Sequence, residues 1–156
     1  MTTANSARSV MRFAGAFSYL SNFHPSPIVT GDGLTYPTAE HAFQAAKTID
    51  ARQRARICAA PTPGEAKSAG RGVKLRPGWD GMRKRVMLRV IQVKFSPGSE
   101  LAGWLCGTNL AVLVEGNTWH DNYWGECTCG RAACAGPGTN YLGRILMAVR
   151  MTLQED

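Results

Sequence analysis

The chain has 156 residues, enough for one domain with a substantial buried core. With 44% hydrophobic and 19% charged residues it has an ordinary globular composition, and no apolar run approaches the roughly 20 residues that a membrane-spanning helix needs. The N-terminus lacks the apolar segment of a secretory signal, so we expect a cytoplasmic protein whose five cysteines stay reduced. Residues 1–10 are polar and predict a flexible tail, followed by a single domain over residues 11–156.

The formal net charge of +7 is concentrated in one part of the chain. Residues 50–94 hold twelve Lys or Arg against three acidic residues, whereas the remainder is slightly acidic. Such a basic block attracts phosphate groups, whether of nucleotides or of nucleic acid. A solvated helix face with ordinary surface charge would have the same composition, so the block favours a phosphate-bearing partner without requiring one.

The first half of the chain predicts a hairpin and three short helices. Residues 26–37 contain two β-rich pieces around a Gly-Asp-Gly turn and predict the hairpin. Thr38 is a good N-cap for a helix that follows directly. Two further helices are expected over residues 50–60 and 63–70, the second beginning with a proline, which suits a first helical turn.

The second half predicts three more helices and one strand. Residues 82–95 form an amphipathic pattern with valines inward and Arg or Lys outward, including Lys94. Residues 96–108 predict a helix, and the β-branched content of residues 109–117 predicts a buried strand. A last helix is expected from near Asn140. The sequence therefore predicts a mainly α (α+β) domain of several short helices with a few short strands.

The segment YPTAEHAFQAAK, residues 36–47, places an acid and an amine on one face of its predicted helix. Glu40 and Lys47 are two turns apart, with Phe43 and Gln44 between them. An exposed ion pair more often uses a spacing of three or four, so we expect this face to line a pocket, with an inert pair as the alternative. The helix dipole favours an ionised Glu40 unless burial opposes it, and the small apolar neighbours of Lys47 favour a lowered pKa.

Aromatic and polar side chains crowd together in residues 115–126. Trp119 and Trp124 flank His120 and Asp121, and rings beside carboxylates make flat slots for bases or sugars. Either tryptophan alone is equally typical of a core anchor. The crowd of polar groups around them favours a functional role for the stretch as a whole.

Three cysteines follow in the segment CTCGRAAC. Cys127, Cys129 and Cys134 form a pattern that could hold zinc, with His120 or a water as the fourth ligand, but it lacks the usual paired C-x2-C knuckles. A loop of free thiols and a disulfide are the alternatives. We expect no cofactor and leave a structural zinc open.

Five segments occur in a fixed order along the chain: FSYLSNF (17–23), YPTAEHAFQAAK (36–47), EAKSAGRGVKLRPGW (65–79), MLRVIQVKF (87–95) and YWGE…GTNYLGRILMAVR (123–150). In order and wording they resemble the NADAR family, also called YbiA-like N-glycosidases. The resemblance implies a compact, mainly α domain with a few short strands. It also implies hydrolysis of an N-glycosidic bond at a ribose.

The resemblance implies two classes of substrate. Family members are associated with removing ADP-ribose from guanine bases in nucleic acid, which we expect here, and others with phosphorylated riboflavin-pathway intermediates. A non-catalytic module that binds ADP-ribose or NAD is a third hypothesis, but loss of Glu40 or Lys47 would have been its signature, and both are present. Oligomeric state cannot be derived from these motifs.

The active-site role carried over from the family falls on Glu40 and Lys47, and Asp121 is a further candidate catalytic residue, as a carboxylate that could direct water. Glu40 or Asp121 would direct water at C1′, or Lys47 would form a Schiff base with the sugar. The cysteine-bearing insert departs from the shorter members of the family, which argues against a catalytic metal there. The residues expected to bind substrate are Asn22, Phe23, Gln44, Gly70, Arg71, Trp79, Trp119, Trp124 and Asn140.

Overall fold

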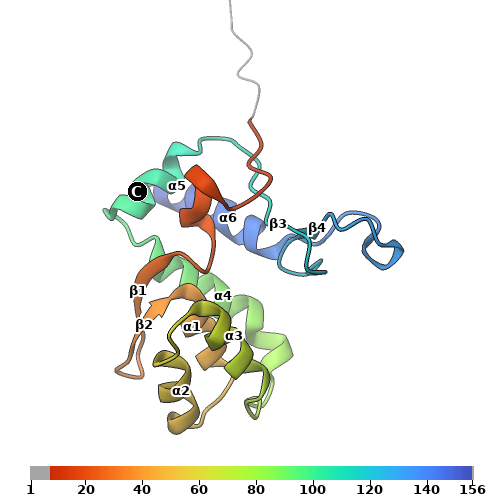
Figure 1. Ribbon diagram of the computed structural model, residues 1–156. Coiled ribbons are helices and arrows are strands. Elements are labelled where there is room, and N and C mark those ends of the chain that lie inside the picture. Colours follow the sequence, from red (N-terminus) through yellow and green to blue (C-terminus); the bar gives the residue numbers. More distant parts are fainter. Residues whose placement is uncertain (1–7, 156) are drawn as a thin grey trace, which may run out of the picture. The chain divides into compact units, whose positions relative to one another are not determined.

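The computed structural model describes residues 8–155, and the chain forms two compact units (Figure 1). The central unit is Asn22–Ser96, and the terminal unit combines the described parts of Met1–Ser21 and Pro97–Asp156. Both are built mainly of short helices with a few short strands, which confirms the expected mainly α fold. Within residues 8–155 no helix combines the length and the apolar character needed to cross a membrane.

The terminal unit is centred on two helices that pack against each other, α5 (Glu100–Gly107) and α6 (Tyr141–Glu155). A 3-10 helix, η1 (Gly15–Leu20), contacts α5 through Tyr19, whose hydroxyl donates to the Trp104 carbonyl at 3.1 Å. Leu142, Leu146 and Val149 of α6 are buried, as its apolar periodicity predicts.

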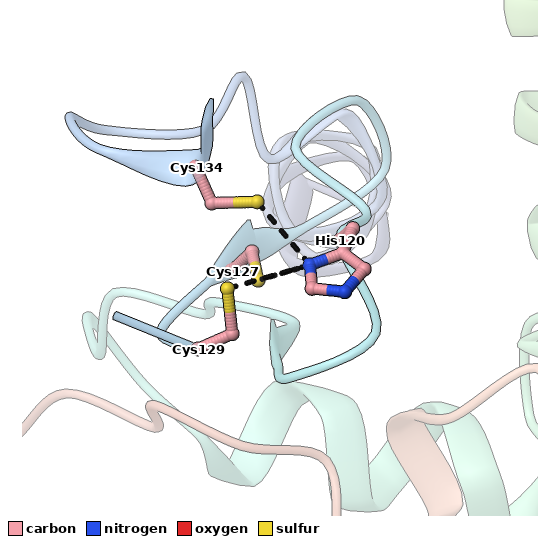
Figure 2. Close-up of side chains that lie close together, drawn as sticks. All are labelled: His120, Cys127, Cys129 and Cys134. Atoms are coloured by element: carbon pink, nitrogen blue, oxygen red, sulfur yellow. Dashed lines mark hydrogen bonds between the residues drawn. The ribbon is translucent and has the colours of Figure 1, made fainter. Parts of the chain in front are cut away.

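Between α5 and α6 the chain runs through two very short parallel strands, β3 (Gly116–Asn117) and β4 (Glu126–Cys127). A 3-10 helix, η2 (Ala132–Cys134), follows β4. The loop after β3 carries His120, and the segment from β4 to η2 carries three cysteines whose side chains point toward it (Figure 2).

The expected buried strand over residues 109–117 is wrong: only β3 and an isolated bridge between Val10 and Leu113 form there. The reason is that side chains replace a neighbouring strand. Asn140 donates to the Leu113 carbonyl at 2.9 Å and accepts from the Glu115 N–H at 3.0 Å, while Arg150 donates to the Ala111 carbonyl at 3.0 Å.

Residues 1–7 of the expected tail lie outside the described residues. Val10, the last residue of that tail, belongs to the folded unit. Its side chain is 6% exposed, its N–H donates to the Val112 carbonyl, and its own carbonyl accepts from Val114.

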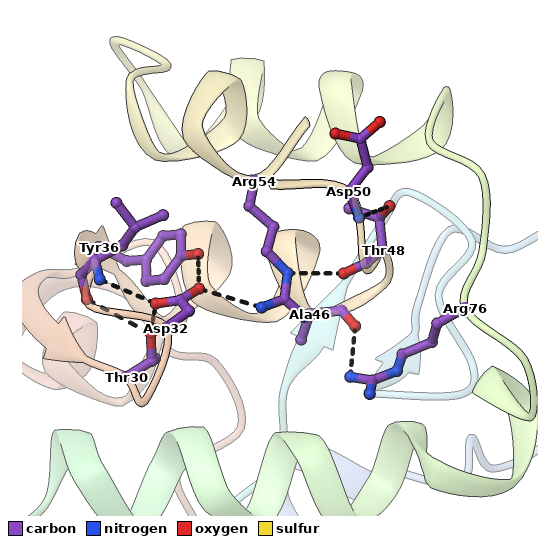
Figure 3. Close-up of polar contacts among 9 residues, drawn as sticks. Thr30, Asp32, Tyr36, Ala46, Thr48, Asp50, Arg54 and Arg76 are labelled. Carbon is purple, nitrogen blue, oxygen red and sulfur yellow. Dashed lines mark hydrogen bonds and ion pairs between the residues drawn. The ribbon is translucent and has the colours of Figure 1, made fainter. Parts of the chain in front are cut away.

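The central unit begins with the expected hairpin, in which β1 (Pro25–Val29) pairs antiparallel with β2 (Thr35–Thr38). Its turn is organised around the Asp32 carboxylate, which accepts from the Thr30 and Tyr36 hydroxyls and from a backbone N–H (Figure 3). Arg54 lies 3.5 Å from the same carboxylate and donates to the Thr48 carbonyl at 2.8 Å. This network fixes the hairpin against the helix that carries Arg54.

Four helices complete the central unit: α1 (Ala39–Ala46), α2 (Ala51–Cys58), α3 (Pro63–Arg71) and α4 (Trp79–Lys94). The first three have side-chain caps, from Thr38, Asp50 and Thr62, which accept from N–H groups of the first turn. Alanines let α1 sit in the middle of the unit, because they allow close approach of neighbours. They pack in a core with Ile28, Tyr36, Ile57, Ala66 and Val90.

Arg76 closes the C-terminal end of α1 (Figure 3). Its backbone N–H donates to the Lys47 carbonyl at 2.7 Å, and its guanidinium lies 3.5 Å from the Ala46 carbonyl. These contacts satisfy carbonyls that a helix end leaves without partners, and they fix the backbone of Lys47.

Helix α4 starts at Trp79, earlier than the predicted residue 82, and Lys94 at its end is 3% exposed rather than outward. A lysine stem is aliphatic and can be buried, and the ammonium group lies 5.1 Å from the Phe95 ring centroid. A cation in the last turn also complements the helix dipole. Periodicity alone therefore placed Lys94 on the wrong face.

Candidate active site

Helix α1 places Glu40 in its first turn, with the side chain only 7% exposed. The Glu40 N–H donates to the Asn22 carbonyl at 3.0 Å, and the carboxyl oxygen Oε1 accepts from Gln44 Nε2 at 2.6 Å. One face of α1 thus holds a buried acid and a buried amide in direct contact.

Burial raises the pKa of Glu40 above its usual value. The hydrogen bond from Gln44 and the positive charges of Lys67 and Lys47 act in the opposite direction but do not cancel the burial. A carboxyl group held toward its protonated form is suited to donate a proton.

Lys47 follows α1 directly and is half-buried. Burial lowers its pKa, opposed by the charge of Glu40 and assisted by the nearby charges of Lys67 and Arg71. Within the described part of the chain no salt bridge joins Lys47 to Glu40. A lysine with a lowered pKa and no direct counter-ion has the properties of an amine nucleophile.

Two aromatic rings form a wall beside Lys47. The ring centroids of Phe43 and Trp79 are 5.4 Å apart, both side chains are buried, and the Lys47 ammonium lies 5.9 Å from the Phe43 centroid. Trp79, predicted to bind substrate, is therefore packed behind Phe43. The wall keeps water away from one side of the lysine, which is consistent with its lowered pKa.

Gly70 of α3 lies directly against Gln44. A Cβ atom at position 70 would overlap the Gln44 side chain, so the glycine makes room for this amide. Gly70 is one of the residues expected to bind substrate, and in the structure it packs against Gln44. Arg71, the next residue, is exposed at the end of α3.

Two buried polar atoms of this region have no hydrogen-bond partner among residues 8–155: Gln44 Oε1 and Asn22 Oδ1. Asn22 is 6% exposed, and its amide nitrogen lies 3.5 Å from the sulfur of Met87. An unpaired buried acceptor costs about 1–3 kcal/mol, so such atoms mark places where a ligand can supply the missing donor.

His41 and Phe23 belong to the two N-terminal family segments and differ in their surroundings. The ring of His41 lies 2.8 Å from the Thr38 hydroxyl and 3.0 Å from the Ala60 carbonyl, so it is a packed, capping histidine rather than a base. Phe23, predicted to line the pocket, is 42% exposed.

Asp121 and Asn140, which lie in the terminal unit, both bind backbone groups through their side chains. One carboxylate oxygen of Asp121 accepts from the N–H groups of Tyr123 and Trp124, at 3.0 and 2.8 Å. Both ends of the Asn140 amide bind the backbone of residues 113–115. These contacts organise the loop, and they leave the Asn140 amide committed to the protein.

The two tryptophans predicted to bind substrate in the terminal unit, Trp119 and Trp124, also differ. Trp124 packs in a cluster of three rings, with centroids 4.8 Å from Tyr123 and 6.5 Å from Tyr141. Trp119 is 57% exposed. Of the two, Trp119 has the free ring surface that a stacking role needs.

A group that could hold a metal lies in the same unit. The ligand atoms of His120, Cys127, Cys129 and Cys134 all lie within 4.8 Å of one another. The alternative of a disulfide is not realised, because all five cysteines are free thiols.

A hollow of about 150 Å³ lies between α2 and α3. Its lining contains one charged side chain, Arg56, and no carboxylate. None of the residues predicted for the site lines it, so we place the candidate site by the chemistry of α1 instead.

Sequence reasoning missed Lys67 and gave Phe43 no role. Lys67 acts electrostatically on both Glu40 and Lys47, and the only signal for it was the basic block in which it lies. Phe43 lies on the same helix face, three residues after Glu40, so its contact with Lys47 follows from helix geometry.

Comparison with known proteins adds a family to this geometry. The sequence model of the NADAR domain matches residues 11–154, which run through both units. The N-glycosidase YbiA of Escherichia coli strain K12 is 38% identical over 135 residues, covering 85% of this chain and 79% of YbiA. The NMR structure of E. coli YbiA matches with a TM-score of 0.77 at 33% identity, covering 97% of this chain and 92% of that one.

A maize protein, the chloroplastic riboflavin biosynthesis protein PYRR, is 38% identical over 150 residues. The match covers 86% of this chain but 23% of the maize protein. The similarity to PYRR therefore concerns one part of a longer polypeptide.

Proposed function

The chain belongs to the NADAR family, and from that premise we propose that it hydrolyses the bond between ribose C1′ and a nitrogen, with Glu40 and Lys47 as the reacting groups. The observation that carries the proposal is the pairing of opposite pKa shifts on one helix face: burial raises the pKa of Glu40 and lowers that of Lys47. Groups shifted toward their neutral forms are typical of acid–base and nucleophilic catalysis.

Glu40 is proposed as the proton donor. Breaking a C1′–N bond puts negative charge on the departing nitrogen, and a neutral carboxyl group can protonate it as it leaves. Because burial raises the pKa of Glu40, the proton-donor role is favoured over the other role considered, that of a base directing water.

Lys47 is proposed as the nucleophile. Its Nζ bonds to C1′ while the C1′–N bond breaks, and the leaving nitrogen takes the proton of Glu40, which the carboxylate then recovers from the lysine nitrogen. Opening of the sugar ring gives a Schiff base between Lys47 and C1′. Addition of water to the Schiff base releases the sugar and restores the free amine of Lys47.

As the substrate we propose ADP-ribose linked to guanine. Three cations, Lys47, Lys67 and Arg71, act on one another or on Glu40 at this site, and a pyrophosphate group is complementary to such a cluster. The basic block of residues 50–94 would likewise attract a nucleic-acid strand carrying the modified base.

A second candidate substrate is a phosphoribosyl intermediate of the riboflavin pathway. The observation in its favour is the similarity to a maize protein named for riboflavin biosynthesis. Both candidates place a phosphate-bearing ribose at the same Glu40–Lys47 face, and they differ in the base that leaves.

The test offers both substrates to the same preparation. The protein is incubated with an oligonucleotide carrying ADP-ribose on guanine and, separately, with a phosphoribosylated aminopyrimidine, and base release is followed by mass spectrometry. Restoration of plain guanine supports the first substrate, and cleavage of the aminopyrimidine alone supports the second. Binding of ADP-ribose without release from either substrate would contradict the enzyme proposal and favour a binding module.

A further inference from the structure

Four side chains of the terminal unit converge on one point (Figure 2). The Nδ1 atom of His120 lies 3.9 Å from the sulfur of Cys127, 3.3 Å from that of Cys129 and 3.4 Å from that of Cys134. The arrangement gathers residues that are up to 14 positions apart in the sequence.

These separations match those between ligands of one tetrahedral zinc ion. With Zn–S of about 2.3 Å and Zn–N of about 2.0–2.1 Å, a tetrahedral angle puts sulfur and nitrogen about 3.6 Å apart. The three observed distances bracket this value. All four ligand atoms lie within 4.8 Å of one another, so a central ion would be within reach of each.

We propose that His120, Cys127, Cys129 and Cys134 bind one Zn²⁺ ion, with His120 coordinating through Nδ1. Three thiolates and one imidazole make a Cys₃His set, which is one of the donor sets of structural zinc sites. Four protein ligands leave no position for water or substrate, so the site stabilises the fold and does not take part in the glycosidase chemistry.

The loop that bears His120 is held by hydrogen bonds between the Asn117 side chain and the Asp121 backbone. Asn117 donates to the Asp121 carbonyl at 2.7 Å and accepts from the Asp121 N–H at 3.1 Å, which closes the loop. His120 itself has φ of 71°, a conformation that costs energy for a residue with a side chain and that aims the ring at the sulfurs.

The cysteine segment is held in the same way. The Cys127 N–H donates to the Asn122 side chain at 2.8 Å, and the Thr128 N–H donates to the Asn117 carbonyl at 2.7 Å. After Cys129, Gly130 takes φ of 80° and turns the chain, so that the Arg131 N–H lies 3.5 Å from the Cys129 sulfur. Backbone N–H groups aimed at sulfur stabilise thiolate ligands.

Two of the three thiols are buried, and the third, Cys129, is half-buried. Cys127 is 7% and Cys134 is 9% exposed, which gives little access for a protein or small-molecule thiol. Softness of the donors also matters: three thiolates select zinc over magnesium, calcium or manganese, which prefer oxygen ligands. The ion would tie the loop after β3 to β4 and to η2.

The test measures metal in the full-length protein purified under reducing conditions with zinc in the growth medium. Native mass spectrometry is expected to show one zinc per chain. Cys129→Ser and Cys134→Ser are expected to lose it, whereas the matched control Cys106→Ser, at a half-buried thiol of α5, keeps it. X-ray absorption of the wild-type protein is expected to show three sulfur ligands at about 2.3 Å and one nitrogen at about 2.0 Å.

The absorption measurement needs no variant, so it decides the question even if the serine variants fail to fold. A wild-type chain that binds no zinc when zinc is added, although its three cysteines are reduced, would overturn the proposal. So would zinc retained in both serine variants, or a disulfide between two of the three cysteines in the freshly purified protein. The result is separate from the glycosidase assay, because the site is proposed to be structural.

Discussion

The central and terminal units each contain a cluster of polar side chains, but the side-chain amides of the two clusters differ in how they are hydrogen-bonded. On α1, Gln44 Oε1 and the neighbouring Asn22 Oδ1 are buried with no partner among the residues described. In the loop of the terminal unit, the amides of Asn117 and Asn140 bind backbone at both ends. The comparison teaches that polar crowding alone does not indicate a substrate site: buried acceptors without a partner are what favour α1 for the proposed substrate.

The largest effect is expected from removing the proton of Glu40. Glu40→Gln keeps the size of the side chain and an oxygen that can accept from Gln44, but it cannot protonate a leaving nitrogen. We expect kcat to fall by about 10²–10⁴-fold, measured as base release under saturating substrate. Asp121→Asn is the comparison in the terminal unit. If Asp121→Asn lowers kcat by this factor while Glu40→Gln stays active, the assignment of the two clusters is reversed.

Asn140 should show the opposite behaviour, a loss of stability rather than of chemistry. Asn140→Ala removes the partners of the Leu113 carbonyl and the Glu115 N–H and puts alanine at φ of 49°. We expect the free energy of unfolding to fall by about 3–5 kcal/mol, measured by urea denaturation.

The matched control is Asn109→Ala, an exposed asparagine at φ of 52°. It is expected to cost about 1–2 kcal/mol, from the strain of the backbone conformation and the loss of one exposed hydrogen bond, which the Asn109 side chain donates to the Gly107 carbonyl. If Asn140→Ala instead weakens substrate binding while its stability equals that of Asn109→Ala, the amide contacts ligand and the comparison fails.

Gly70 tests whether the packing around Gln44 matters for activity. Gly70→Ala forces a Cβ into the Gln44 side chain, and we expect a loss of about 1–3 kcal/mol in stability together with a fall in activity. Gly64→Ala in the same helix has only the Thr62 hydroxyl at 3.9 Å and should change neither. Thermal unfolding and base release of both variants measure the difference; equal behaviour of the pair would count against a tight Gly70–Gln44 contact.

The smallest effect concerns the pH dependence of stability. Burial raises the pKa of Glu40 above 4.5, so between that value and the raised pKa the folded chain keeps a proton that the unfolded chain has lost. Stability is therefore lost as pH rises through this window. Glu40→Gln, which cannot ionise, should unfold at a higher temperature than wild type at pH 8 and lose this advantage at pH 4.

The measurement is a series of thermal unfolding curves from pH 4 to pH 8. Glu100→Gln, at an exposed glutamate of α5, is the control for removing a carboxylate. An advantage of Glu40→Gln that grows toward low pH would show that Glu40 is stabilised in its charged form, contrary to the burial argument.

Local features of the fold could be predicted from the sequence because neighbouring residues determine them. Thr38 caps α1 and Pro63 opens α3, and the hairpin turn lies at the expected glycines. The strand over residues 109–117 could not be rejected in advance, because its backbone is satisfied by Asn140 and Arg150, far along the chain. Burial of a lysine such as Lys94 likewise depends on packing that periodicity does not contain.

The candidate site shows the same division. The spacing of Glu40, Gln44 and Lys47 follows from helix geometry and was visible in the sequence. The contribution of Lys67 and the contact of Gly70 with Gln44 come from α3, a different helix, so only the fold could reveal them. The engagement of Asp121 by backbone N–H groups was equally invisible, since it depends on the path of the loop.

The most direct test of the account is to trap the bond proposed between Lys47 and the sugar. The protein is mixed with ADP-ribosylated guanine oligonucleotide and reduced with borohydride during turnover, and its peptides are mapped by mass spectrometry. We predict a sugar adduct on Lys47 in the wild-type protein, and neither adduct nor base release with Lys47→Met. Base release without any adduct on Lys47, together with an active Lys47→Met variant, would contradict the central claim.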